Sequence, residues 1–224
     1  MDHMISSDAD AICGPVAIHK ESNLLEQFQA LDFAGMMAIT AVSMKFKWFY
    51  LANGANMLVR MQALDINNIS WQEEYASGDD MSLISHLQKK HSKIEFAKDK
   101  AAIVSTSAQV NLSDFFHQRL RWGTKNKSSK SMLMLFQLGI AYLVSVFSIL
   151  AFIGMFFQPK FLYIILVKLL GDAILLTSVA PYFRKQTLLI KIPVFSIMHS
   201  TYIAVIGTLS LLPLRYQWKG RFVK

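Results

Sequence analysis

The chain has 224 residues, of which 53% are apolar, 12% aromatic and 17% charged, and its formal net charge is +8. This composition is too apolar for an ordinary soluble domain and too charged for a simple bundle of membrane spans, so it favours a mixed architecture. The basic residues concentrate beside apolar segments, where they would meet anionic lipid, which argues against a nucleic-acid partner. Cys13 is the single cysteine, so an internal disulfide and a cysteine-based metal cluster are excluded.

The first candidate site is Asp8-Ala9-Asp10. Two carboxylates that flank a small residue can hold a divalent cation, which in turn can carry a nucleoside diphosphate. The alternative is a polar turn that leads into a strand, predicted over residues 11–16. Asp8 and Asp10 are therefore secondary metal-ligand candidates, and the turn is the simpler interpretation.

A helix is predicted from Asn23, which can cap it, with Glu26 at the third helical position in a capping-box arrangement. The apolar run continues through residues 34–44 and ends in Lys45-Phe46-Lys47-Trp48-Phe49-Tyr50. Charged residues interrupt its first half, so it is not convincing as a membrane span. We expect an amphipathic helix that lies at the lipid interface and ends in aromatic and lysine anchors. A helix packed into a protein core is the alternative.

Two polar segments follow this helix. Asn53-Gly54-Ala55-Asn56 precedes a candidate strand and is either an ordinary turn or a wall that presents amide groups to a polyhydroxylated ligand. Gly78-Asp79-Asp80 introduces a helix, where acidic residues are favoured in any case. The functional alternative is that one of the two adjacent carboxylates acts as a general base in a cleft.

Residues 93–97 and 101–106 are candidate strands, because they alternate or are rich in β-branched side chains. A helix is then predicted over residues 112–122, capped by Asn111. In that helix Gln118, Arg121 and Trp122 fall at positions i, i+3 and i+4 and share one face. An amide, a guanidinium and an indole group therefore point the same way.

A basic linker, residues 124–131, separates this half from a membrane half, residues 132–224. Residues 132–157 carry no charged side chain and exceed the roughly 20 residues that cross a bilayer. Residues 161–183 form a second apolar segment, in which Lys168 and Asp172 can pair on one helical face.

The third apolar segment spans residues 193–214. It contains His199, which more often packs or forms a hydrogen bond than binds a ligand. Three full spans with a cytoplasmic N-terminal half would place the basic C-terminal residues outside, against the positive-inside rule. The third segment is therefore re-entrant, or the charge bias is overruled.

Taken together, these segments resemble the membrane-integrated family 2 glycosyltransferases of bacterial type, the group that includes cellulose and hyaluronan synthases. The matching segments occur in family order and cover nearly the whole chain. They are Gly14-Pro15-Val16, Phe28-Gln29-Ala30-Leu31-Asp32, Asn53-Gly54-Ala55-Asn56, Gly78-Asp79-Asp80, Gln118-Arg119-Leu120-Arg121-Trp122 and Trp218-Lys219-Gly220-Arg221. The resemblance implies an α/β fold: the C-terminal, acceptor-side part of a GT-A type catalytic domain over residues 1–123, with an interfacial helix, followed by an α-helical transmembrane region.

Carried over to this sequence, the resemblance implies that Asp80 is the general base, with Asp79 beside it, and that Gly54 and Asn56 line the acceptor side. Gln118, Arg121 and Trp122 would form the family's QxxRW site, where a guanidinium neutralises diphosphate oxygens and an indole stacks on a sugar ring. The reaction implied is inverting transfer from a nucleotide-diphosphate sugar to a lipid or polysaccharide acceptor.

The resemblance also implies a setting and a cofactor. The protein would lie in the bacterial inner membrane with its catalytic part in the cytoplasm. The full enzyme would use a divalent cation, Mg²⁺ or Mn²⁺, with ligands upstream of this chain, because Asp8 and Asp10 lie too close to Gly14-Pro15 to be the family's Asp-x-Asp motif. We therefore expect a C-terminal part that lacks the nucleotide-binding first half. The alternative is a non-catalytic membrane protein or scaffold subunit derived from such an enzyme.

Overall fold

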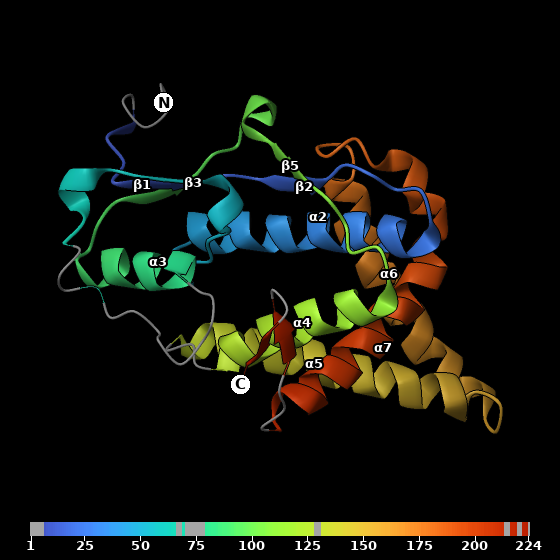
Figure 1. Ribbon diagram of the computed structural model, residues 1–224. Coiled ribbons are helices and arrows are strands. Elements are labelled where there is room, and N and C mark those ends of the chain that lie inside the picture. The colour runs from blue at the N-terminus through green and yellow to red at the C-terminus, as the bar shows by residue number, and fades with distance from the viewer. Residues whose placement is uncertain are drawn as a thin grey trace. The chain divides into compact units, whose positions relative to one another are not determined.

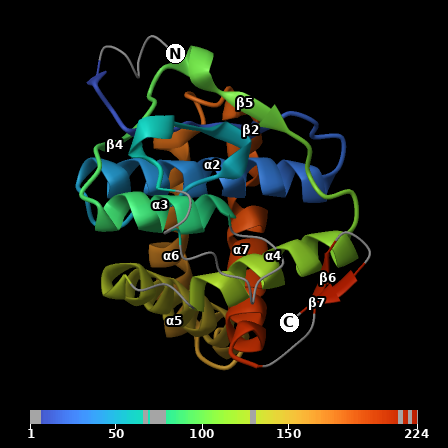
Figure 2. The same cartoon turned by 60° about the vertical axis from the view of Figure 1, so that its left-hand side comes forward.

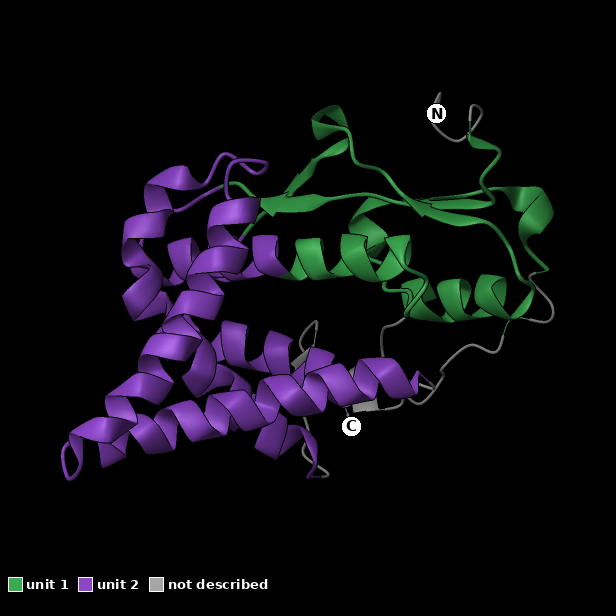
Figure 3. Cartoon of the chain, turned by 180° about the vertical axis from the view of Figure 1, so that it is seen from behind, with its two compact units in different colours: residues 1–19, 36–107 green, residues 20–35, 108–224 purple. Residues whose placement is uncertain are grey.

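The computed structural model describes residues 7–65, 69, 79–127, 131–212, 216–218 and 221–223. The chain divides into two compact units (Figure 3): unit 1 comprises Met1–His19 and Met36–Ser107, and unit 2 comprises Lys20–Gly35 and Ala108–Lys224. The domain boundary expected at residue 123 stays a prediction. Helix α2 (Leu24–Lys45) is continuous, and its first part belongs to unit 2 while its second part belongs to unit 1.

The strands of unit 1 form two small sheets. They are β1 (Ala11–Cys13), β2 (Val16–Ile18), β3 (Met57–Val59), β4 (Ile94–Phe96) and β5 (Val104–Thr106). Strand β1 pairs antiparallel with β3 and parallel with β4, and β2 pairs parallel with β5. The single strand expected over residues 11–16 is thus two strands that break at Gly14-Pro15, because proline has no N–H group for a sheet ladder.

The core of unit 1 lies between the β3-β1-β4 sheet and helices α2 and α3, which lie on one side of it (Figures 1 and 2). Helix α3 (Asp79–Lys89) contributes the buried side chains Ile84 and Leu87, and α2 contributes Met44. They pack with Ala11 and Cys13 of β1 and Ile94 of β4. Short 3-10 turns, η1 (Gly54–Asn56), η2 (Met61–Ala63) and η4 (Lys100–Ala102), lead into or follow the strands.

Helix α2 starts where the sequence predicts, because the Glu26 N–H donates to Asn23 Oδ1 over 2.9 Å. Most of its length is buried, with Phe28 and Leu31 only 2% and 1% exposed. This burial agrees with the alternative, a helix packed into a protein core, and the position of α2 at a lipid interface stays a prediction. Its end is exposed as expected, where Phe46 stacks on Trp48 with ring centroids 5.3 Å apart.

Unit 2 is mainly helical. Beyond the first part of α2, its described elements are α4 (Leu112–Lys127), α5 (Met132–Gly154), η5 (Pro159–Phe161), α6 (Leu162–Val179), η6 (Gln186–Lys191), α7 (Ile192–Ser210) and the hairpin strands β6 (Tyr216–Trp218) and β7 (Arg221–Val223). Helix α4 continues to Lys127, so the first half of the expected linker is helical. The remainder of that linker, residues 128–130, and Lys219-Gly220 lie outside the described residues.

Three helical segments of unit 2 are long and apolar enough to cross a membrane. They are Met132–Gly154, Pro159–Val179 and Gln186–Ser210, with mean hydropathies of 2.2, 2.0 and 1.6. Large apolar side chains on them point away from the protein, among them Phe147 and Val167. An exposed apolar surface of this kind is stable in lipid rather than in water, so the three membrane segments predicted from the sequence are confirmed as candidate spans.

Candidate active site

Unit 1 brings together two of the predicted motifs, Asn53-Gly54-Ala55-Asn56 and Asp80. The Gly54 N–H donates to Asp80 Oδ2 over 3.1 Å, and the Met81 N–H donates to Asp80 Oδ1 over 2.9 Å. Asn53 caps the short turn by accepting from the Ala55 N–H. The Asp80 carboxylate is half-buried and oriented by two backbone donors, whereas Asp79 is exposed. Gly78 lies outside the described residues.

Asn56 holds the turn against the rest of the sheet. Its Nδ2 donates to the carbonyl oxygens of Pro15 and Ala102, each over 2.8 Å, and its own carbonyl accepts from the Gly14 N–H over 2.8 Å. A Cβ atom on Gly14 would lie 2.3 Å from Asn56 Nδ2, so any larger residue would have to displace this amide. The structure thus gives Asn56 a structural task, and its role on the acceptor side stays a prediction.

Cys13 lies at the end of β1, where the charge of Asp80 acts on its thiol. Burial and, to a smaller extent, the negative charge of Asp80 raise the pKa of Cys13 from 9.0 to about 12. The thiol is therefore protonated at neutral pH. A protonated thiol is a weak nucleophile, so Cys13 is not a candidate for covalent chemistry.

The raised pKa of Cys13 predicts a loss of stability at alkaline pH. Between about pH 9 and 12 the unfolded state releases the thiol proton while the folded state retains it, so unfolding becomes easier as pH rises. The contribution is fully present below pH 9. Denaturant unfolding of the wild type and of Cys13→Ala from pH 8 to 11 measures it. We expect the stability difference between the two proteins to shrink or reverse with rising pH, and a constant difference would contradict the prediction.

Unit 2 carries the predicted Gln118, Arg121 and Trp122 on α4. The helix begins as expected, since the Asp114 N–H donates to Asn111 Oδ1 over 2.8 Å and Asn111 Nδ2 donates back to the Asp114 carboxylate. The three side chains are half-buried, and their helical spacing places them on one face. Asp80 belongs to unit 1, and Gln118, Arg121 and Trp122 belong to unit 2.

Arg119 is the arginine of this segment that the sequence reasoning missed. Its side chain is 4% exposed and its guanidinium binds the Asp32 carboxylate, 3% exposed, over 2.8 Å. The guanidinium carbon lies 4.6 Å from the ring centroid of Trp122, 4.9 Å from that of Phe115 and 5.3 Å from that of Tyr202. Asp32 could have indicated this arginine, because a carboxylate within an apolar helix requires a partner of opposite charge when it is buried.

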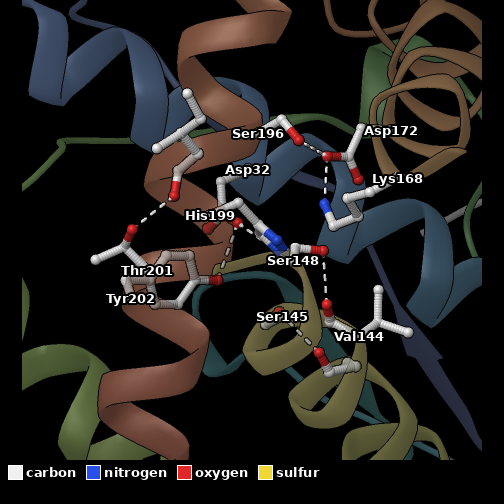
Figure 4. A network of polar contacts seen from close by, with 12 residues as sticks. Asp32, Val144, Ser145, Ser148, Lys168, Asp172, Ser196, His199, Thr201 and Tyr202 are labelled. Atoms are coloured by element: carbon white, nitrogen blue, oxygen red, sulfur yellow. Dashed lines mark hydrogen bonds and ion pairs between the residues drawn. The ribbon is translucent and has the colours of Figure 1, made fainter. Parts of the chain in front are cut away.

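A second set of polar side chains lies on α6 and α7 (Figure 4). Lys168 and Asp172 form the expected ion pair one helical turn apart, and Ser196 donates to the same Asp172 oxygen. Tyr202 donates to Asp32 Oδ1 over 2.9 Å, and His199 Nε2 lies 3.8 Å from that atom. His199 therefore sits beside Asp32, among residues whose charges are already paired.

The metal-ligand candidates at the N-terminus have protein partners. Asp8 pairs with Arg60 over 3.4 Å, and Asp10 accepts from the Lys93 N–H over 2.7 Å. Among the residues that the structure describes, no group of three or more His, Cys, Asp or Glu side chains could hold a metal ion. The divalent cation, whose ligands are expected upstream of this chain, stays a prediction.

The chain is thus a mixed α/β protein with three apolar helices long enough to cross a membrane. It carries a carboxylate held at a turn and a helix face with an arginine and a tryptophan. The sequence model of the family described as "Glycosyl transferase family group 2" matches residues 1–211. The chain belongs to this family. Neither the curated proteins nor the solved structures gave a match.

Proposed function

We propose that the chain takes part in inverting transfer of a sugar from a nucleotide-diphosphate sugar to a lipid or polysaccharide acceptor at a membrane. The observation that carries the proposal is the Asp80 carboxylate, which two backbone N–H groups hold at the Asn53-Gly54-Ala55-Asn56 turn. Family membership supports the donor class and the type of reaction. The three apolar helices support a membrane setting. A bacterial inner membrane with cytoplasmic chemistry belongs to the same proposal.

Asp80 acts as the general base in this proposal. It accepts the proton of the acceptor hydroxyl while that oxygen attacks the anomeric carbon of the donor sugar. The nucleoside diphosphate leaves from the opposite face of the sugar, so the anomeric configuration inverts. Gly54 supports the step indirectly, because its N–H orients Asp80 Oδ2.

The Gln118–Trp122 face serves binding in this proposal. Arg121 neutralises diphosphate oxygens, which suits a planar guanidinium with several N–H donors. Trp122 stacks on a sugar ring of the acceptor, and Gln118 donates or accepts a hydrogen bond beside it. Half-burial of all three side chains supports this role, since each remains partly accessible on one helical face.

Asp80→Asn is the direct test, because asparagine keeps the shape and an oxygen for one of the two backbone N–H groups but cannot take the proton. We expect turnover to fall by about 100-fold or more, the usual contribution of a general base. Sugar transfer and nucleotide release are measured in membranes that carry the chain joined to its upstream coding region, with UDP-glucose, UDP-N-acetylglucosamine and GDP-mannose as donors. Asp79→Asn is the matched control, since Asp79 is exposed, and it should retain most activity. Unchanged turnover in Asp80→Asn would overturn the assignment.

A further inference from the structure

The strongest unassigned feature is the buried ion pair between Asp32 of α2 and Arg119 of α4. Both side chains are almost fully buried, and their charged atoms lie 2.8 Å apart. Tyr202 supplies a further hydrogen bond to the Asp32 carboxylate over 2.9 Å. A buried ion pair is weak evidence for stability, because well-packed apolar residues often do as well or better. The pair is better explained as a means of holding the neighbouring side chains in one arrangement.

The ion pair lies against the indole ring of Trp122. Arg119 and Trp122 stand at positions i and i+3 of α4, and the guanidinium carbon lies 4.6 Å from the Trp122 ring centroid. Phe33, the neighbour of Asp32 on α2, contacts the same indole with ring centroids 6.0 Å apart and an angle of 39° between the rings. Two consecutive residues of α2 thus hold Trp122, one directly and one through Arg119.

Aromatic rings surround the Arg119 guanidinium. The Phe115 ring centroid lies 4.9 Å from the guanidinium carbon and that of Tyr202 lies 5.3 Å from it, so aromatic rings from α4 and α7 surround the cation. A guanidinium can pair with a carboxylate in its plane and stack on rings with its faces, whereas an ammonium is a point charge without faces. These surroundings therefore suit a guanidinium better than an ammonium group.

We propose that Asp32 and Arg119 are positioning residues that hold the Trp122 indole in the orientation needed to stack on the acceptor sugar. The inference rests on the proposed function, because it takes Trp122 as the residue that contacts the acceptor. A stacking platform binds well only if the ring is ordered before the ligand arrives, since ordering it afterwards reduces affinity. Loss of the pair should therefore weaken acceptor binding without removing the base, Asp80.

Two conservative variants distinguish the charge of the Asp32–Arg119 pair from the contact between the guanidinium and the Trp122 ring. Asp32→Asn keeps the shape and an oxygen for Tyr202 but removes the charge that holds Arg119. Arg119→Lys keeps a cation for Asp32 but removes the planar group that lies over Trp122. Tyr202→Phe is the control, because it removes one hydrogen bond to Asp32 and leaves the ring beside Arg119. The Arg119→Lys variant keeps a paired charge, so it tests the proposal even if Asp32→Asn does not fold.

The first readout is the Trp122 ring itself, in protein that carries 5-fluorotryptophan, with the Trp122 resonance assigned by Trp122→Phe. We expect Arg119→Lys and Asp32→Asn to shift or broaden this resonance and Tyr202→Phe to leave it in place. An unchanged resonance in folded Arg119→Lys would overturn the positioning role. This measurement needs no turnover, so it stands even if the proposed function fails.

The second readout is the KM for the acceptor. We expect both variants to raise it by about tenfold or more, with the KM for the nucleotide sugar changed much less, because misplacement of a positioning group acts on the ligand it serves. A shifted Trp122 resonance with an unchanged acceptor KM would overturn the link between this pair and the acceptor. A uniform fall in activity with no change in KM would also contradict it, since that is the result of a merely structural role.

Discussion

Replacement of Gly14 by alanine is expected to destabilise the protein by about 3 kcal/mol, through overpacking and the loss of hydrogen bonds at Asn56. The added Cβ would lie 2.3 Å from Asn56 Nδ2, so the amide must leave the carbonyl oxygens of Pro15 and Ala102. Thermal unfolding followed by circular dichroism in detergent measures the loss. Turnover should fall as well, because the same turn holds Asp80 through Gly54.

A double-mutant cycle with Asn56→Ala tests the cause. Once the Asn56 amide is absent, the three nearest atoms that the added Cβ would meet are gone, and Gly14→Ala should cost much less than in the wild type. Gly139→Ala is the matched control, because nothing lies within 4 Å of a Cβ at Gly139 on α5. Equal costs of Gly14→Ala with and without Asn56→Ala would rule out the clash.

The second large effect is expected from the Lys168–Asp172 pair on α6. Lys168→Met leaves the Asp172 carboxylate without its cation, and Asp172→Leu leaves the ammonium alone, in a helix apolar enough to cross a membrane. An unpaired charge in such a helix costs about 3 kcal/mol, so each single substitution should lower stability by that order. Thermal melting in detergent, read by size-exclusion chromatography, measures the change.

The two substitutions combined should restore much of the stability, because the double variant buries no unpaired charge. Ser196 loses its acceptor in that variant, yet a serine in a helix can donate to a carbonyl of its own preceding turn. A double variant less stable than either single variant would show that the pair contributes more than mutual neutralisation.

Helix positions were predictable because their signals are local. Asn23 and Asn111 cap α2 and α4 as expected, through side-chain oxygens that accept N–H groups three residues on. The three apolar helices were predictable from length and composition alone, and the Lys168–Asp172 pair followed from helical spacing. The candidate site was predictable only as separate motifs, and their family order supplied the residues Gly54, Asp80 and Trp122.

The sequence by itself thus determined the helices, their caps, the apolar segments and the family, because each depends on residues that are near one another in the chain or on composition. The tertiary structure decided that α2 is buried, that Asn56 binds backbone carbonyls at Pro15 and Ala102, and that Arg119 pairs with Asp32 beside Trp122. These features depend on contacts between distant segments. No local pattern encodes such contacts, since the same residue types suit an exposed turn or a solvated helix face equally well.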